Sequence, residues 1–189
     1  KSFTVRRASL ILTIRRPLLI ALCARISGRA RLTLLAKVFE MAFPWPEVGA
    51  ALTDIITPMP VIDEDRLARN IARAQAYMAS INRPFRPHIK THKLISVAQM
   101  QVDAGAKGLN CQKITEAEAF ADAGFGDILI TYNILGAAKL ARLSELNARV
   151  PVLRVVADNE TAVSGLAARF FADRPLRVLV ECDTGGNRC

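Results

Sequence analysis

The chain has 189 residues, which is enough for one domain with a sizeable core but too few for two full domains. A formal charge of +9 would normally favour a nucleic-acid or anionic-membrane partner. However, nine basic residues and a single acid before Pro44 account for +8 of that charge, and the rest of the chain is nearly neutral. Nucleic-acid binding by the remainder of the chain is therefore not expected.

Residues 1–43 form a basic leader whose Arg-rich, acid-poor composition is typical of a transit peptide. Arg15, Arg16 and Pro17 interrupt its longest apolar run, and each central charge costs about 2.5–3.5 kcal/mol in a bilayer, so stable membrane insertion is not expected. Three origins remain open: sequence upstream of a natural start at Met41, a targeting or membrane-surface segment, or a structured extension. Residues 44–56 are expected to form a linker.

The cysteines show neither CxxC pairing nor the spacing of zinc ligands. Two of them, Cys111 and Cys182, fall within apolar runs, where a small buried side chain is expected. Nothing in this pattern requires an oxidising compartment, so a cytoplasmic location is expected.

From residue 57 onward, short apolar runs alternate with amphipathic segments. Helices are expected over 65–81, through Val97 up to Gly105, from a Thr115 cap to Gly124, and over 137–147 and 159–171. Six strands are expected between and beside these helices, over residues 60–63, 85–91, 107–111, 127–132, 152–156 and 177–182.

This strict alternation predicts an α/β fold with a parallel sheet. A doubly wound sheet could use six strands, but no Gly-rich fingerprint follows the first strand. Polar residues gather instead after the second, third, fourth and sixth strands, at the carboxyl ends where a barrel places its active site. We therefore expect a partial (β/α)8 TIM barrel, with the remaining strands outside this chain.

The segment 86–93, Arg-Pro-His-Ile-Lys-Thr-His-Lys, contains both histidines of the chain and ends a predicted strand. Strand alternation predicts that His88, Lys90 and His92 share the face pointing into the barrel. A lysine there must be neutral, paired or covalently used, and a partly neutral amine can add to an aldehyde. The plainer interpretation is a solvated basic loop, with Lys93 as a surface charge.

This octapeptide resembles the cofactor segment of the D-threonine aldolase and eukaryotic-type D-serine dehydratase family, within the alanine-racemase-like class of pyridoxal-phosphate barrels. The similarity runs from about residue 57 to the end of the chain. Further matching segments are Thr57-Pro58, Asp63, 70–72, 104–106, 116–118, 127–130 and 180–189.

The resemblance implies that Lys90 forms the internal aldimine with pyridoxal 5′-phosphate and that His88 and His92 line the pocket. Arg188 matches a family arginine that would meet the cofactor phenolate or the substrate carboxylate. Weaker pocket candidates follow the third and fourth predicted strands: Gln112, Tyr132 and Asn133.

The resemblance also implies a lyase acting on a D-3-hydroxy amino acid, homodimeric when full length. Its divalent metal would be held by a C-terminal β-domain that is absent here, and no metal ligands are expected in this chain. An amino-acid racemase and a non-catalytic cofactor-binding protein of the same class are the alternatives. A racemase usually carries Lys-Ala-Asn-Ala-Tyr-Gly where this chain has Lys-Thr-His-Lys. Because much of the barrel is missing, we expect the 189-residue chain alone to have little or no activity.

Overall fold

The computed structural model describes residues 46–170 and 174–187. The chain divides into two compact units, Lys1–Glu64 and Asp65–Cys189. The described part of the first unit contains one short 3-10 helix, η1 (Leu52–Asp54). The predicted leader, residues 1–43, lies outside the described residues, and the linker over 44–56 stays a prediction.

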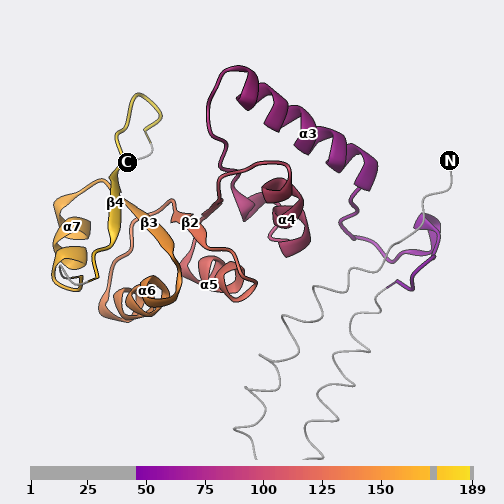
Figure 1. The fold of residues 1–189 in the computed structure, drawn as a ribbon. Coiled ribbons are helices and arrows are strands. Elements are labelled where there is room, and N and C mark those ends of the chain that lie inside the picture. Colours follow the sequence, from indigo (N-terminus) through magenta and orange to yellow (C-terminus); the bar gives the residue numbers. More distant parts are fainter. Residues whose placement is uncertain (1–45, 171–173, 188–189) are drawn as a thin grey trace, which may run out of the picture. The chain divides into compact units, whose positions relative to one another are not determined.

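The second unit alternates helices and strands along the chain (Figure 1). Helix α3 begins at the boundary with the first unit, and each later strand is preceded by a helix. In chain order the elements are α3 (Glu64–Ser80), η2 (Ile89–Thr91), α4 (Ile95–Asp103), β1 (Leu109–Cys111), α5 (Ile114–Asp122), β2 (Asp127–Ile130), α6 (Ala137–Arg149), β3 (Val152–Ala157), α7 (Glu160–Ala167) and β4 (Arg177–Val180).

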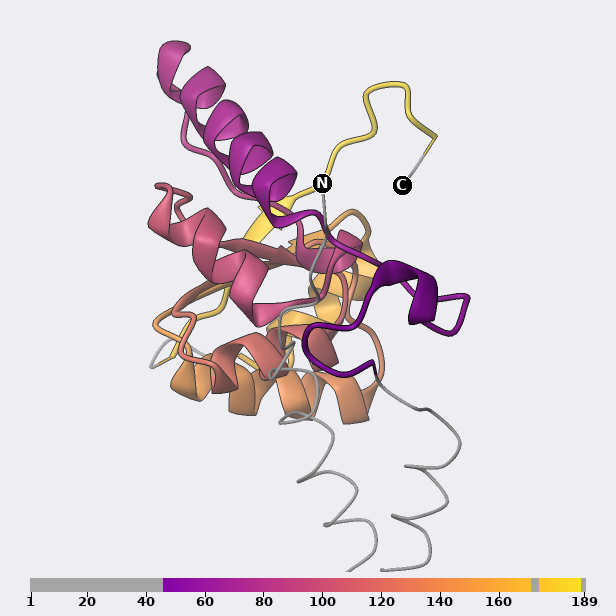
Figure 2. The ribbon, with the colours of Figure 1, turned by 90° about the vertical axis from the view of Figure 1, so that its right-hand side faces the viewer.

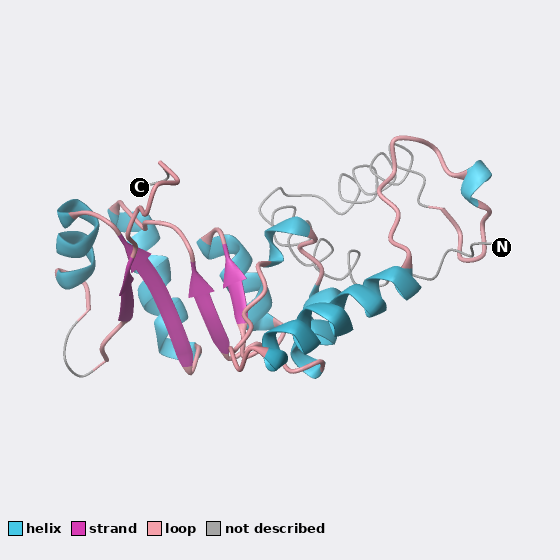
Figure 3. Cartoon of the chain, turned by 90° about the horizontal axis from the view of Figure 1, so that it is seen from above, coloured by secondary structure: helices cyan, strands magenta, loops and turns pink. Residues whose placement is uncertain are grey.

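The four strands form one parallel sheet in the order β1-β2-β3-β4. Leu109 aligns with Ile128, which aligns with Leu153 on the next strand. Figure 3 shows the strands side by side with their carboxyl ends at the same edge. The residues that directly follow each strand in the sequence therefore lie along that edge.

One face of this sheet packs against helices to form the core. Helices α5 and α6 lie against this face in Figure 2. Alternate strand residues point into the helical layer, as expected of βα units. The core contains Leu109 and Cys111 of β1, Ile128 and Ile130 of β2, Leu153 and Val155 of β3, and Ala117, Phe120, Leu143 and Leu146 of the helices.

The other face of the sheet carries the intervening residues. Asn110, Leu129 and Arg154 align across β1, β2 and β3, and all three are only half-buried. His88 joins this row through an isolated parallel bridge to Asn110. In a closed barrel this is the interior face.

The prediction of six strands is wrong for the described residues, where four are found. Residues 60–63 form no strand there, and Val61 and Ile62 are exposed. The predicted strand over 85–91 is reduced to the bridge at His88, because Pro87 has no N–H to donate and a 3-10 helix follows at once. The fold observed is α/β with about four βα units, consistent with part of a barrel.

The predicted helices are confirmed, with shifted ends. The less exposed positions of α3 are four apolar residues that share a face and one glutamine: Leu67, Ile71, Ala74, Met78 and Gln75. Helix α5 begins at Ile114, so the predicted Thr115 cap is wrong; Lys113 is the cap residue. Asn159 caps α7 by accepting a 2.9 Å hydrogen bond from the N–H of Ala162.

Candidate functional site

The turn that carries Lys90 follows the sheet's first bridge at the carboxyl edge. His88 is the N-cap of η2, and its Nδ1 accepts a hydrogen bond from the N–H of Lys90 at 3.2 Å. The N–H groups of His92 and Lys93 both donate to the carbonyl of Ile89, at 3.1 and 2.7 Å. The prediction that strand alternation continues through His92 is therefore wrong, because the chain turns after Ile89.

Lys90 is exposed within this turn. It lies two residues beyond the His88–Asn110 bridge, so its backbone stands at the carboxyl ends of the parallel strands. Within residues 46–170 and 174–187, no carboxylate forms an ion pair with Lys90. The amine is thus accessible to a small molecule.

Hydrogen bonds at both ring nitrogens select the tautomer of His88. Its Nε2 lies 3.0 Å from Oγ1 of Thr131, and that hydroxyl donates to the carbonyl of Cys111 at 3.2 Å. The hydroxyl has one proton, so its oxygen accepts from Nε2–H of His88. Since Nδ1 accepts from Lys90, the imidazole is neutral with its proton on Nε2.

His92 is the C-cap residue of η2 and is half-buried. Its Nδ1 accepts a 3.0 Å hydrogen bond from the N–H of Leu94. Burial lowers the pKa of His92 below its ordinary value, with opposing contributions from Gln101 and Leu94. The predicted role of His92 in the pocket stays a prediction; the contact shown holds the end of the turn.

Lys93 is exposed, as expected of a surface charge, and it is also paired with an acid. Its Nζ lies 2.7 Å from Oε1 of Glu116, in the first turn of α5. The other oxygen of Glu116 accepts a 2.8 Å hydrogen bond from the N–H of Gln112. Burial raises the pKa of Glu116, but the bonds from Lys93 and Gln112 outweigh it and the pKa is lowered overall.

The weaker pocket candidates all follow strand ends on this edge. Gln112 follows β1 and is half-buried, whereas Tyr132, after β2, is exposed. Asn133 donates through Nδ2 to Oδ1 of Asp158, which follows β3, at 2.6 Å. The structure thus brings Asn133 together with a residue that the sequence did not single out.

The remaining predicted site residue, Arg188, lies outside the described residues. It follows a turn in which Oδ1 of Asp183 accepts from the N–H groups of Gly185 and Gly186, both at 2.8 Å. The residues missed from the sequence are Thr131, Glu116 and Asp158. Thr131 and Asp158 each carried a signal, as the first polar residue after the apolar runs of β2 and β3, and Glu116 opens the matching segment 116–118.

Two further features limit the chemistry available to the described residues. Burial, followed by the nearby charge of Glu116, raises the pKa of the Cys111 thiol to about 12, so Cys111 is inert at neutral pH. Cys182 is exposed, contrary to expectation. No group of three or more metal-ligating side chains occurs in the described part of the chain, and no helix there is long and apolar enough to cross a bilayer.

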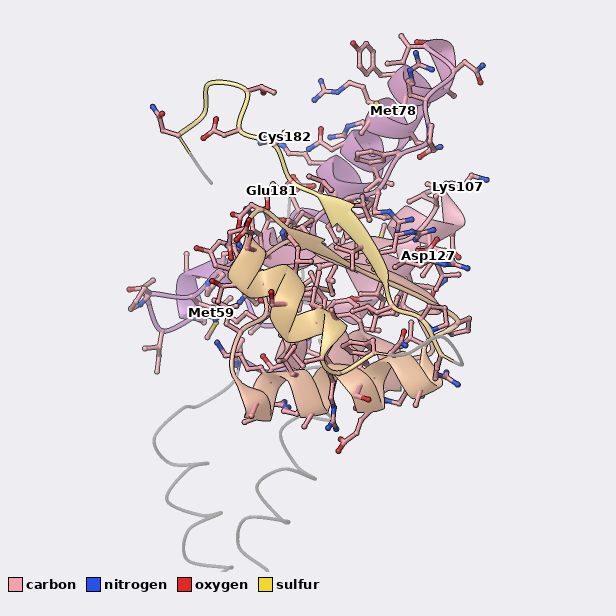
Figure 4. All side chains as sticks on the ribbon, turned by 90° about the vertical axis from the view of Figure 1, so that its left-hand side faces the viewer. Met59, Met78, Lys107, Asp127, Glu181 and Cys182 are labelled. Atoms are coloured by element: carbon pink, nitrogen blue, oxygen red, sulfur yellow. The ribbon has the colours of Figure 1, made fainter. Side chains whose placement is uncertain are left out.

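The opposite, amino-terminal edge of the sheet carries a charge network. Asp127, at the start of β2, pairs with Arg86 through two bonds of 2.9 and 3.0 Å and with Arg154 at 2.5 Å. Figure 4 labels Asp127 near one end of the strands and Glu181 near the other. Because it lies away from Lys90, this network belongs to the framework of the fold.

Comparison with known proteins agrees with this arrangement. A curated D-threonine aldolase from an Arthrobacter species is 38% identical over 151 residues, which cover 79% of this chain and 40% of the aldolase. The D-threo-3-hydroxyaspartate dehydratase of Delftia sp. strain HT23 is 37% identical over 139 residues, covering 72% of this chain and 36% of the dehydratase. The chain therefore spans about 40% of the length of the curated relatives it matches.

Solved structures show the same relationship. The crystal structure of D-threonine aldolase from Filomicrobium marinum matches with a TM-score of 0.65 and 35% identity, over 73% of this chain and 37% of that one. The family model of the alanine racemase N-terminal domain matches residues 62–189, which include every strand of the sheet. The chain belongs to the alanine racemase N-terminal domain family.

Proposed function

We propose that this protein is a pyridoxal-phosphate-dependent lyase acting on a D-3-hydroxy amino acid, of the aldolase or dehydratase type. The observation that carries the proposal is the exposed Lys90 at the carboxyl edge of a parallel sheet, in a turn capped by His88. Relatives that are 34–38% identical to this chain are D-threonine and 3-hydroxy-D-aspartate aldolases and a 3-hydroxyaspartate dehydratase.

The residues at this edge fit pyridoxal phosphate. The cofactor is held through an amine, and Lys90 offers an exposed one with no ion pair among the described residues. His88 presents a neutral ring beside the same turn, with its Nε2 proton directed to Thr131. When bound, pyridoxal phosphate supplies an electron sink for a bond broken at the substrate Cα.

The chain's own residues would then act in defined ways. Lys90 would hold the cofactor through its amine and, in a dehydratase reaction, could take the α-proton of the substrate. His88 supports the Lys90 backbone through its Nδ1. We assign Arg188 to the substrate carboxylate or cofactor phenolate because its planar guanidinium suits bidentate contact with an anion.

We also propose that a divalent metal takes part in the reaction and that a C-terminal domain of the full-length protein would hold it. A solved structure of the Delftia dehydratase carrying a C353A substitution is described as the metal-free form. A metal there would polarise the β-hydroxyl of the substrate. No step is assigned to the metal from the residues described above.

Replacing Lys90 tests the proposal directly. The purified full-length protein, supplied with pyridoxal phosphate, should show visible absorbance of the bound cofactor, and borohydride reduction should attach the cofactor covalently to Lys90. Lys90→Ala should abolish both the attachment and turnover. Lys107→Ala, at an exposed lysine on the opposite edge, is the control and should keep both. Attachment of the cofactor at a lysine other than Lys90 would contradict the proposal.

The products distinguish the reaction types. An aldolase releases glycine and an aldehyde from D-threonine, whereas a dehydratase releases ammonia and an oxo acid from D-serine or D-3-hydroxyaspartate. Racemisation of a D-amino acid without either set of products would replace the lyase proposal by the racemase alternative.

A further inference from the structure

The second lysine of the motif is joined to a nearly buried carboxylate. The side chain of Lys93 is 56% exposed, but its Nζ lies 2.7 Å from Glu116, whose side chain is only 9% exposed. A carboxylate so placed is costly unless it is paired and hydrogen-bonded. Lys93 therefore neutralises a charge that the fold has withdrawn from water.

Lys93 is also part of the turn that carries Lys90. It adopts a left-handed backbone conformation, with φ of 55°, and its N–H donates to the carbonyl of Ile89 at 2.7 Å. That conformation is uncommon for residues with a side chain. Because Lys93 has this backbone conformation three residues after Lys90, it fixes the direction in which the chain leaves the turn.

Glu116 links this turn to the neighbouring rim. Its second oxygen accepts the N–H of Gln112, the first residue after β1, at 2.8 Å. The carboxylate of Glu116 thus forms an ion pair with the side chain of Lys93 and accepts a hydrogen bond from the backbone of Gln112. These two segments flank the carboxyl edge on which the proposed cofactor would lie.

We propose that Lys93, acting through Glu116, is a positioning residue that fixes the η2 turn and thereby the direction of Lys90. The inference rests on the proposed function for its catalytic consequence. The structural part of the inference, that the Lys93–Glu116 ion pair immobilises η2, does not depend on the proposed function. The counterpart at the other end of the turn is the cap by His88.

An exposed ion pair elsewhere in the same fold provides a matched control. Arg149 of α6 pairs with Asp122 of α5, and both side chains are exposed, at 43% and 66%. Exposed pairs of this kind contribute little to stability. Arg149→Met therefore removes a comparable cation without touching η2.

The test compares Lys93→Met with Arg149→Met in the full-length protein, because little or no activity is expected of the 189-residue chain alone. In the cofactor-free state, amide hydrogen exchange of residues 89–93 should be faster in Lys93→Met than in the control. With pyridoxal phosphate added, kcat should fall by about 10- to 100-fold while KM changes less, because misplacement of a reacting group costs roughly that factor. Lys93→Arg should restore part of the loss, since it keeps the charge.

Glu116→Gln provides a second variant. It keeps an acceptor for Gln112 but loses the charge, so it should speed exchange in η2, and the double variant with Lys93→Met should be no worse than Lys93→Met alone. Exchange over 89–93 equal to that of Arg149→Met would overturn the inference. So would unchanged kcat. Failure of the wild-type protein to attach the cofactor at Lys90 would instead reject the proposed function, since the exchange measurement needs no cofactor.

Discussion

The imidazole of His88 is oriented by bonds at both of its nitrogens. The N–H of Lys90 donates to Nδ1, and Nε2 lies 3.0 Å from the Thr131 hydroxyl, which donates to the carbonyl of Cys111. A protonated ring would need two acceptors and could not accept from Lys90. Thr131 therefore provides the acceptor for the Nε2–H of a residue 43 positions away in the sequence.

Thr131→Val is expected to leave the Nε2–H of His88 without its acceptor. The substitution preserves the branched shape and removes the hydroxyl, while the Cys111 carbonyl keeps the N–H of residue 131 at 2.9 Å. The loss of one hydrogen bond should cost about 1 kcal/mol of unfolding free energy. Because the N–H of Lys90 still donates to Nδ1, nitrogen-15 NMR of the imidazole should show the Nε2–H form in both proteins, with the Nε2 resonance shifted in the variant.

Thr131→Ser is the matched control, since it retains the hydroxyl and should retain the wild-type Nε2 resonance. Identical ring-nitrogen shifts in wild type and Thr131→Val would show that the hydroxyl does not determine the state of His88. Under the proposed function, turnover should fall in the valine variant and be largely kept in the serine variant.

At the scale of elements, alternation in the sequence was sufficient for the regular parts of the fold. Strands β1, β2 and β3 were predictable because each lies in a short apolar run between two helical patterns. Residues 60–63 show the same chemistry but have no strand beside them among the described residues. A strand forms only where a neighbouring strand is present to pair with it, and the local sequence does not show whether one is.

The site divides in the same way. Lys90 and His88 could be singled out as candidates because they lie in one short motif, and a motif is a local signal. The partners Thr131 and Glu116 come from other elements, and only the fold brings them to the turn. The 3-10 helix itself was missed because a side-chain cap by His88 overrides the strand pattern, which periodicity does not register.

Gly105 ends helix α4 in a conformation that should not accept a side chain. Its φ is 112°, and a Cβ there would lie 2.9 Å from Nε2 of Gln75 on α3. Gly105→Ala should therefore lower the free energy of unfolding by about 1–3 kcal/mol, from backbone strain and displacement of Gln75. Urea denaturation measures the change.

Gly126→Ala is the control for that substitution. The φ of Gly126 is not in the left-handed region, and the nearest atoms to its Cβ would be those of Pro151 at an ordinary 3.5 Å. We expect no destabilisation beyond about 0.5 kcal/mol there. Equal losses at the two glycines would show that the backbone conformation at Gly105 is not the cause.

Considered whole, the second unit has the proposed site and a charge network at opposite edges of its sheet. The carboxyl edge gathers Lys90, His88 and Asn133, all on turns that follow strands or bridges. The amino edge holds Asp127 between Arg86 and Arg154, which joins the segment before the bridge to β2 and β3. Loss of that network should affect stability rather than the chemistry of the turn.

Asp127→Asn tests this division through both stability and pH. Burial raises the pKa of Asp127, but the hydrogen bonds and charges of Arg86 and Arg154 outweigh it and hold the pKa below its ordinary 3.8. Removing the charge should cost about 2 kcal/mol at pH 7, because two partly buried guanidinium groups lose their partner. Asp122→Asn, in the exposed pair with Arg149, should cost less than about 0.5 kcal/mol.

The pH dependence carries the stronger test. Because the folded-state pKa is depressed, the unfolded chain takes up the proton first as the solution is acidified. The stabilisation is thus complete above the ordinary pKa of 3.8 and is lost as the pH falls from there through the folded-state value. Urea denaturation should give a constant difference between wild type and Asp127→Asn from pH 7 to about pH 5, and a shrinking one below about pH 4. Glu116, whose pKa is also lowered, is present in both proteins and cancels in the comparison. A difference that persists undiminished at pH 3 would mean that the carboxylate charge of Asp127 does not support the fold.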